Sequence, residues 1–128
     1  MINNFLNNIY YKQNSKNRNF VLVLFETSTG FYELDNCKLS TTDKINNDYN
    51  IFIPFYESNM KGCKIIEIRK NFEMEFFLKM RDNNYITIFR NTNFSTGESF
   101  QELNIISVDE SNYDFLEYYN ESDLVTTM

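Results

Sequence analysis

Hydrophobic residues in the first ten positions recur with helical spacing. Ile2, Phe5, Leu6, Ile9 and Tyr10 fall at i, i+3, i+4, i+7 and i+8, and asparagine fills most of the other positions. This spacing is typical of the apolar face of an amphipathic helix. The pattern therefore predicts a short N-terminal helix, which ends in the polar run from residue 13 to residue 19.

The next hydrophobic segment is continuous rather than periodic. Valine, leucine and phenylalanine dominate Phe20–Glu26, Thr27–Gly30 has the composition of a turn, and Phe31–Asp35 resumes an extended pattern. A short apolar run bounded by turn residues is typical of a strand. Because the run has no polar face, we expect a β-hairpin whose first strand is central and covered on both sides.

A polar connection, Ser40–Asn50, leads from this hairpin to a strand-like segment, Tyr49–Tyr56. Pro54 lies inside that segment and has no N–H to donate to a neighbouring strand. The proline favours an edge position or a bulge in the predicted strand.

Residues 64–81 fit two patterns. Five apolar residues could line one side of a helix: Ile65, Ile68, Phe72, Phe76 and Met80. Apolar residues at every second position from Phe72 to Met80 fit a strand instead, and this alternation is the more regular pattern. Lys70–Asn71 and Asp82–Asn84 then become turns, and Tyr85–Arg90 is the next strand. We therefore expect an antiparallel meander here, with a helix as the alternative, followed by a last strand at Leu103–Val108.

The C-terminal segment, residues 108–128, carries the net charge of the chain. The 18 acidic and 12 basic residues give a net charge of −6, and this segment has no basic residue. The rest of the chain is therefore neutral. The six acidic residues of the segment are Asp109, Glu110, Asp114, Glu117, Glu121 and Asp123.

The same segment has features of a helix. Ser111 followed by Asp114 resembles a capping box. A helical turn of about 100° per residue would put Glu110, Asp114, Glu117 and Glu121 in one stripe, with Tyr118 at its border. Phe115, Leu116 and Tyr119 would lie on the opposite side. The alternative is an acidic tail that only improves solubility.

The predicted fold class is α+β. We expect a single domain over residues 1–128, built on one mostly antiparallel sheet with an N-terminal helix and an acidic C-terminal helix.

Several kinds of chemistry lack the residues they need. The chain has no histidine, which removes the usual general base and most zinc sites. Gly30, Gly62 and Gly97 are isolated and form no phosphate-binding loop. Glu73 and Glu75 could act as a pair of catalytic carboxylates, but the solvent face of a strand explains them better. We therefore predict no catalytic, cofactor-binding or metal-binding residue.

Composition also bears on the compartment and the partner. No signal-like or membrane-spanning segment is recognisable, so a cytoplasmic protein that does not contact membranes is expected. Cys37 and Cys63 fit reduced thiols in that compartment, although a disulfide between them stays open.

A sequence pI of about 4.6 disfavours direct binding of nucleic acid. Four clustered basic residues are expected to divide between strand faces: Lys61, Lys64, Arg69 and Lys70.

The functional hypothesis is a small non-enzymatic inhibitor. The excess of Phe, Tyr, Ile, Asn and Lys indicates an AT-rich gene, such as a mobile bacterial gene or a phage gene. We expect an immunity protein that neutralises a cognate toxin with a positively charged surface, for example a basic nuclease. The alternatives are a phage anti-defence protein that mimics nucleic-acid charge and a carboxylate-dependent enzyme. The predicted partner-binding residues are Asp109, Glu110, Asp114, Glu117, Tyr118, Glu121 and Asp123.

Overall fold

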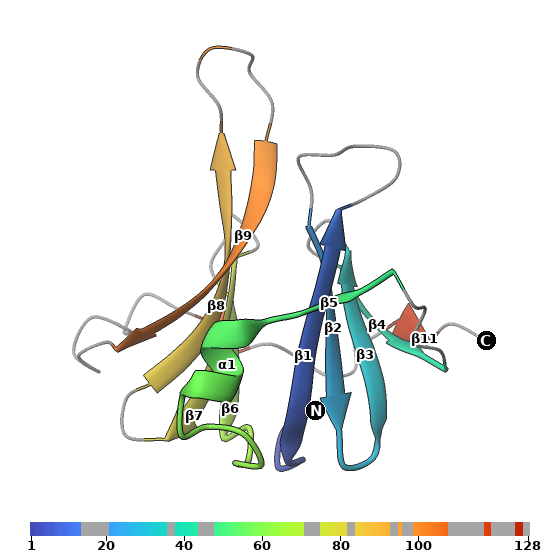
Figure 1. Ribbon diagram of the computed structural model, residues 1–128, viewed down its shortest axis with the longest axis vertical. Coiled ribbons are helices and arrows are strands. Elements are labelled where there is room, and N and C mark those ends of the chain that lie inside the picture. The colour runs from blue at the N-terminus through green and yellow to red at the C-terminus, as the bar shows by residue number, and fades with distance from the viewer. Residues whose placement is uncertain are drawn as a thin grey trace.

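Two β-sheets whose inner faces share one hydrophobic core make up the fold (Figure 1). The computed structural model describes residues 1–13, 21–35, 38–43, 48–70, 75–81, 84–92, 95, 99–107, 117–118 and 125–126. The first sheet has the strand order β11-β4-β3-β2-β1-β5, and the second has the order β10-β6-β7-β8-β9. Neighbouring strands are antiparallel except for β11, which runs parallel to β4.

The first sheet is formed by β1 (Leu6–Gln13), β2 (Val21–Thr27), β3 (Gly30–Asp35), β4 (Lys38–Thr42), β5 (Asn50–Ile51) and β11 (Val125–Thr126). The second sheet is formed by β6 (Glu67–Lys70), β7 (Phe76–Arg81), β8 (Asn84–Thr92), β9 (Ser99–Ser107) and β10 (Glu117–Tyr118). The helix α1 (Ile53–Glu57) follows β5.

The predicted hairpin is confirmed by β2 and β3. The two strands pair from Val23–Leu34 to Thr27–Gly30, and the Thr27 hydroxyl donates to the Gly30 carbonyl at 2.8 Å. β2 lies inside its sheet, and its side chains are buried on both faces. Val23 belongs to the core between the sheets, whereas Leu24 is buried on the outer side. This burial explains why the sequence of β2 has no polar face.

The meander is also confirmed, and the alternative helix over residues 64–81 is wrong. β6, β7 and β8 pair in succession, with Leu78 opposite Ile68 on one side and Ile86 on the other. These three residues are fully buried in the core. The alternation of apolar residues in β7 therefore reflects one face turned toward the first sheet.

The predicted N-terminal helix is wrong, because that segment forms β1. β1 pairs with β2 along its whole length, and its register shifts between Leu6 and Asn8. Such an irregularity lets Leu6 and Ile9, three positions apart, both be fully buried in the same core. The shift imitates helical spacing, which explains the wrong prediction.

The strand predicted at Tyr49–Tyr56 is wrong beyond Ile51. Residues 53–57 form α1, with Pro54 in its first turn and Phe55 as its buried residue. Proline is tolerated there because the first N–H groups of a helix have no intrahelical partner. The Ser58 N–H donates to the Pro54 carbonyl at 3.0 Å and closes the turn.

The predicted C-terminal helix is likewise wrong, and with it the α+β class. Glu117–Tyr118 and Val125–Thr126 are short strands at the ends of the two sheets. Over the described ranges the chain is mostly antiparallel β-structure, with α1 as its single helix. Within those ranges, no helix has the length and apolar character needed to cross a membrane.

A seam of backbone hydrogen bonds joins the two sheets at one side. It consists of Asn3–Leu6, which pair with Gly62–Ile65 just before β6. The Gly62 N–H donates to the Leu6 carbonyl at 2.7 Å, and the Leu6 N–H donates to the Cys63 carbonyl at 2.9 Å. Gly62 has φ +80°, a conformation that favours glycine. The seam continues the edge of the first sheet into the second.

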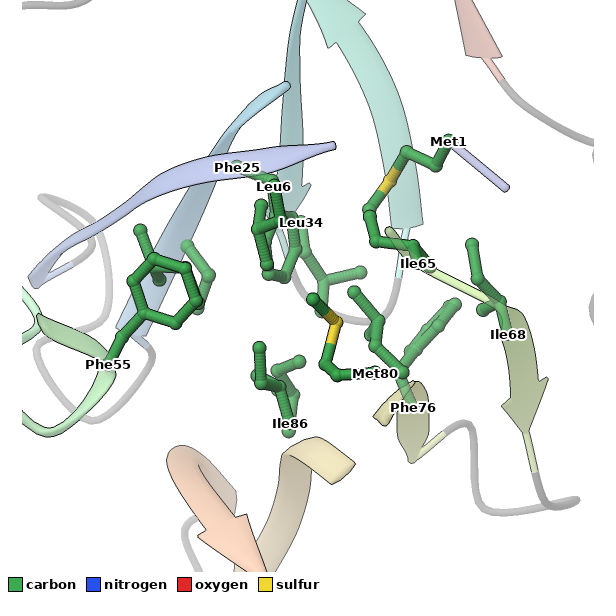
Figure 2. Packing of buried hydrophobic residues seen from close by; sticks show 14 of the residues in the cluster. Met1, Leu6, Phe25, Leu34, Phe55, Ile65, Ile68, Phe76, Met80 and Ile86 are labelled. Atoms are coloured by element: carbon green, nitrogen blue, oxygen red, sulfur yellow. The ribbon is translucent and has the colours of Figure 1, made fainter. Parts of the chain in front are cut away.

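The core lies between the sheets and is closed by α1 (Figure 2). Phe25 and Leu34 come from the first sheet, Met80 and Ile86 come from the second, and Phe55 comes from the helix. All five are at most 1% exposed. Burial of this kind contributes about 1.5–3 kcal/mol for each large apolar side chain.

Candidate binding surface

The outer face of the first sheet carries half-buried polar and aromatic side chains around two buried leucines, Leu22 and Leu24. Strand register puts Asn8, Tyr10 and Lys12 of β1 on this face, together with Glu26 of β2. It also puts Glu33 and Asp35 of β3 there, because Leu24 stands opposite Glu33. Tyr49 and Tyr56 approach from β5 and α1. We call this set the tyrosine–carboxylate surface: Asn8, Tyr10, Lys12, Glu26, Glu33, Asp35, Tyr49 and Tyr56.

One half of this surface is a chain of hydrogen bonds. The Tyr56 hydroxyl donates to Asn8 Oδ1, and Asn8 Nδ2 donates to a Glu26 carboxylate oxygen. Burial raises the pKa of Tyr56 to about 12, with smaller contributions from Tyr10 and from the charge of Glu26. The phenol therefore stays protonated at neutral pH and remains a hydrogen-bond donor.

Tyr56 also contacts a cation. The Lys61 ammonium lies 4.8 Å from the centre of the Tyr56 ring, and the ring packs edge-on against Phe55 with a centroid separation of 5.9 Å. Phe55 is fixed in the core, so α1 holds Tyr56 in a defined orientation. The sequence of this helix thus positions one anchored and one surface aromatic side by side.

The other half of the surface is organised around Tyr49. The Lys12 ammonium lies 4.7 Å from the centre of the Tyr49 ring. Burial, together with smaller contributions from the charges of Glu33 and Asp35, raises the pKa of Tyr49 to about 12. Tyr49 is therefore a neutral phenol beside two acidic residues.

Glu33 has a raised pKa because it is partly buried and lies near Asp35, while Lys12 opposes this shift. Glu33 and Asp35 lie two positions apart on the same face of β3, so the Cα atoms of these two residues are about 7 Å apart. Leu22 and Leu24 are buried between the two flanking strands of polar residues. The surface therefore surrounds an apolar strip with acids, phenols and one lysine.

Two exposed isoleucines adjoin the surface. Ile51 pairs with Tyr10 in the register of β5 with β1 and is 48% exposed, and Ile53 at the start of α1 is 55% exposed. Large apolar side chains next to tyrosines, with a polar rim, are the composition found in the centres of protein–protein interfaces. The arrangement is suited to binding a protein surface.

The residues predicted as partner-binding from the sequence are placed only in part. Glu117 and Tyr118 form β10, where they stand opposite Lys70 and Arg69 of β6. The helical stripe is therefore wrong at these two positions, because their backbone is extended and pairs with β6. The other predicted residues lie outside the described residues: Asp109, Glu110, Asp114, Glu121 and Asp123.

The basic residues of 61–70 do not gather into one patch. Lys61 contacts Tyr56, Lys64 lies 5.4 Å from the centre of the Phe5 ring, and Arg69 Nε lies 3.4 Å from a Glu67 carboxylate oxygen. Each of these three cations has a local partner. The predicted division between strand faces applies only to Arg69 and Lys70, which are neighbours in β6, because Lys61 and Lys64 precede that strand.

Other chemical candidates from the sequence can be located. Glu75 is half-buried just before β7, and Glu73 lies outside the described residues. Cys63 is a free, half-buried thiol whose Sγ lies 3.5 Å from the Asn59 carbonyl oxygen, and Cys37 lies outside the described residues. Within the described ranges, no three His, Cys, Asp or Glu side chains are grouped so that they could hold a metal ion.

The tyrosine–carboxylate surface was missed because its members are far apart in the sequence. Alternation of Asn8, Tyr10 and Lys12 was the available signal, and the helical interpretation of β1 concealed it. The contribution of Tyr49 and Tyr56 depends on how β5 and α1 pack beside β1, which no local pattern records. Comparison of the chain with protein-family models, with curated proteins and with solved structures gave no match.

Proposed function

We propose that this chain is a small inhibitory binding protein that neutralises a positively charged protein, as an immunity protein does for a cognate bacterial toxin. The observation that carries the proposal is the tyrosine–carboxylate surface, with Tyr10, Tyr49 and Tyr56 beside Glu26, Glu33 and Asp35. The proposed site of action is the cytoplasm, where a thiol such as Cys63 stays reduced.

The tyrosines would supply most of the affinity. Tyrosine buries a large rigid ring on binding and offers a hydroxyl, which is why it is enriched among interface hot spots. The Tyr49 hydroxyl is neutral at physiological pH and can donate to a partner carbonyl or carboxylate. The Tyr56 hydroxyl already donates to Asn8 and can accept a hydrogen bond from a partner. Ile51 and Ile53 extend the apolar contact area.

The acidic residues would orient the bound partner and speed its association. Arginine pairs with carboxylates through two parallel hydrogen bonds, and a net charge of −6 attracts a basic partner over a Debye length of roughly 8–10 Å. The acidic residues of 108–128 fit this role without any helical stripe, because long-range attraction depends on charge more than on conformation. A basic nuclease is the toxin class that fits best.

The pair Glu33 and Asp35 favours one second candidate, a carboxylate-dependent hydrolase, because Glu33 has a raised pKa beside another acid. We prefer the binding role because Lys12 and Tyr49 already engage this pair electrostatically. Hydrolysis of a sugar polymer that stops in Glu33→Gln would support the enzyme and contradict the proposal.

The test begins with affinity capture from the host and identification of the partner by mass spectrometry. Co-expression then asks whether the chain relieves growth arrest caused by that partner. Binding of purified variants is measured by surface plasmon resonance. We expect Tyr10→Ala to speed dissociation by about 30-fold if Tyr10 is a hot spot worth ~2 kcal/mol, whereas Tyr10→Phe keeps the ring and loses much less.

A matched pair of variants tests the charge. Glu33→Gln and Asp43→Asn each remove one acid, but Asp43 is exposed just beyond the end of β4, which β3 and β2 separate from β1. Glu33→Gln should weaken binding and Asp43→Asn should not. Glu121→Gln with Asp123→Asn should slow association and reduce its salt dependence while leaving dissociation unchanged. Equal effects of Glu33→Gln and Asp43→Asn, with parental binding by Tyr10→Ala, would remove this surface from the proposal.

A further inference from the structure

Among the described strands, β9 is the last one at its side of the second sheet. It runs for nine residues, from Ser99 to Ser107, and pairs with β8 along its whole length. Among the strands of the described ranges, none lies on its other side. Figure 1 shows β9 crossing in front of β8 at this end of the fold. A long edge presents a row of backbone N–H and C=O groups that another strand can pair with.

The other sheet ends are protected by their shortness. β5, β10 and β11 each contain two residues, so they offer little backbone to a second chain. β9 has none of the usual features that prevent edge pairing: it contains no proline, no lysine and no arginine. Its single charged residue is Glu102.

We propose that β9 pairs antiparallel with β9 of a second copy of this chain. The two second sheets then join edge to edge across a two-fold axis. A two-fold contact between identical strands is closed, so it produces a dimer rather than a fibre.

The sequence of β9 selects one register for this contact. Centring the axis on Leu103 aligns all nine residues, from Ser99 opposite Ser107 onward. In that register Phe100 stands opposite Ile106, and Glu102 stands opposite Asn104 of the second copy. Apolar faces apolar in the Phe100 pair and polar faces polar in the Glu102 pair, which stabilises antiparallel strands, whereas Gln101 stands opposite Ile105.

Neighbouring registers are less favourable. Centring on Glu102 sets two glutamates directly opposite each other, and like charges in that arrangement destabilise a strand pair. Centring on Asn104 sets Glu102 opposite Ile106. The register centred on Leu103 avoids both of these positions for the charged Glu102, and the residue it sets opposite an apolar one is the uncharged Gln101. The Leu103 side chain already packs partly against the core.

This dimer is independent of the proposed inhibitory function. The tyrosine–carboxylate surface lies on the first sheet, and β9 lies in the second. A dimer would present two copies of the binding surface.

Position 104 gives a direct test with the full chain. Asn104 is exposed and its backbone carbonyl, not its side chain, accepts the Thr87 hydroxyl at 3.3 Å, so substitutions there should leave the fold intact. Asn104→Lys brings a cation opposite Glu102, and Asn104→Glu brings a second anion. Because the two-fold axis doubles each pair, we expect the dimer dissociation constant to fall about two- to thirty-fold in the first variant and to rise by a similar factor in the second.

Sedimentation equilibrium over a range of protein concentrations measures these constants, and circular dichroism confirms the fold of each variant. The double variant Glu102→Lys with Asn104→Glu restores opposite charges across the axis and should dimerise at least as well as the parent. Asn59→Lys and Asn59→Glu are the controls, because Asn59 is exposed in a turn and the net charge changes equally. They should leave the constant within about two-fold of the parent, because uniform charge is screened at physiological salt.

Two results would overturn the proposal. The first is a chain that stays monomeric at the highest concentration both as the parent and as Asn104→Lys. The second is a dimer whose dissociation constant does not distinguish Asn104→Lys from Asn104→Glu, since that dimer would use another surface. A parent that is monomeric alone but pairs through β9 with a different protein would give the first result and assign the edge to that protein.

Discussion

Lys12 and Tyr49 join the end of β1 to the residue that precedes β5, with 4.7 Å between the ammonium nitrogen and the centre of the ring. The same ammonium lowers the pKa of Glu33, against the larger effects of burial and Asp35. One cation is therefore shared between an aromatic ring and a carboxylate on adjacent parts of the first sheet. Lys12 therefore affects both the packing of the Tyr49 ring and the charge of Glu33 in the tyrosine–carboxylate surface.

Loss of the lysine should reduce stability. We expect Lys12→Gln to lower the free energy of unfolding by about 0.5–1 kcal/mol, the usual worth of a cation–π contact at an exposed site. In a Tyr49→Leu background the same change should cost less, because the ring is already gone. Urea denaturation of the four proteins measures the difference. Identical losses in both backgrounds would mean that the contact contributes nothing.

Glu33 should make stability fall as pH rises. Below its ordinary pKa of 4.5 the residue is protonated in both the folded and the unfolded state. Above that pH the unfolded state loses the proton first, because the folded pKa is raised, and the free energy of unfolding decreases until the folded pKa is passed. Glu33→Gln lacks this decrease, so its stability relative to the parent should increase between pH 4 and pH 7. A constant difference across that range would contradict the raised pKa.

Two tyrosines should resist ionisation. Tyr49 and Tyr56 have a pKa of about 12 in the folded chain, against an ordinary value of 10.0. The unfolded state therefore releases protons first, and each tyrosine lowers stability as pH rises from 10 to 12. Absorbance of tyrosinate should show a late component that disappears in the Tyr49→Phe, Tyr56→Phe double variant. Tyr32→Phe is the control and should leave the late component in place.

The helix α1 should depend on one side chain. Phe55 is 0% exposed and Ile53, two positions away, is 55% exposed. Phe55→Ala should cost about 3–5 kcal/mol of unfolding free energy because it leaves a cavity in the core. Ile53→Ala should change stability by less than about 0.5 kcal/mol. Chemical denaturation monitored by tyrosine fluorescence provides both values, and similar losses would mean that α1 is not anchored by Phe55.

Local patterns in the sequence were sufficient for the parts of the fold that pair with sequence neighbours. β2 and β3 were predictable because a turn at Ser28–Thr29 joins two apolar runs, and β7 and β8 were predictable because their apolar residues alternate. β1 was not predictable by the same rule, since the register shift between Leu6 and Asn8 changes the phase of its apolar positions. Pro54 was informative but open to two interpretations, because both a strand edge and a first helical turn tolerate proline.

The candidate site could not be predicted, because it depends on the pairing of β1 with β2, and β1 was predicted as a helix. Net charge directed attention to residues 108–128, where the acids are dense. The tyrosine–carboxylate surface instead needs β1, β2 and β3 side by side before Tyr10, Glu26 and Glu33 share a face. Because the chain outside residues 108–128 has as many basic as acidic residues, a net-charge argument could not reveal these carboxylates.

The seam between Asn3–Leu6 and Gly62–Ile65 also has a kinetic consequence. Its two halves are separated by nearly half the chain, whereas β2–β3 and β7–β8 pair locally. Contacts between distant segments form slowly because a long loop must close first. We therefore expect the hairpins to form early and the seam to close late, joining the two sheets. A change at Gly62, whose φ of +80° the seam requires, should slow refolding more than a change in either hairpin turn.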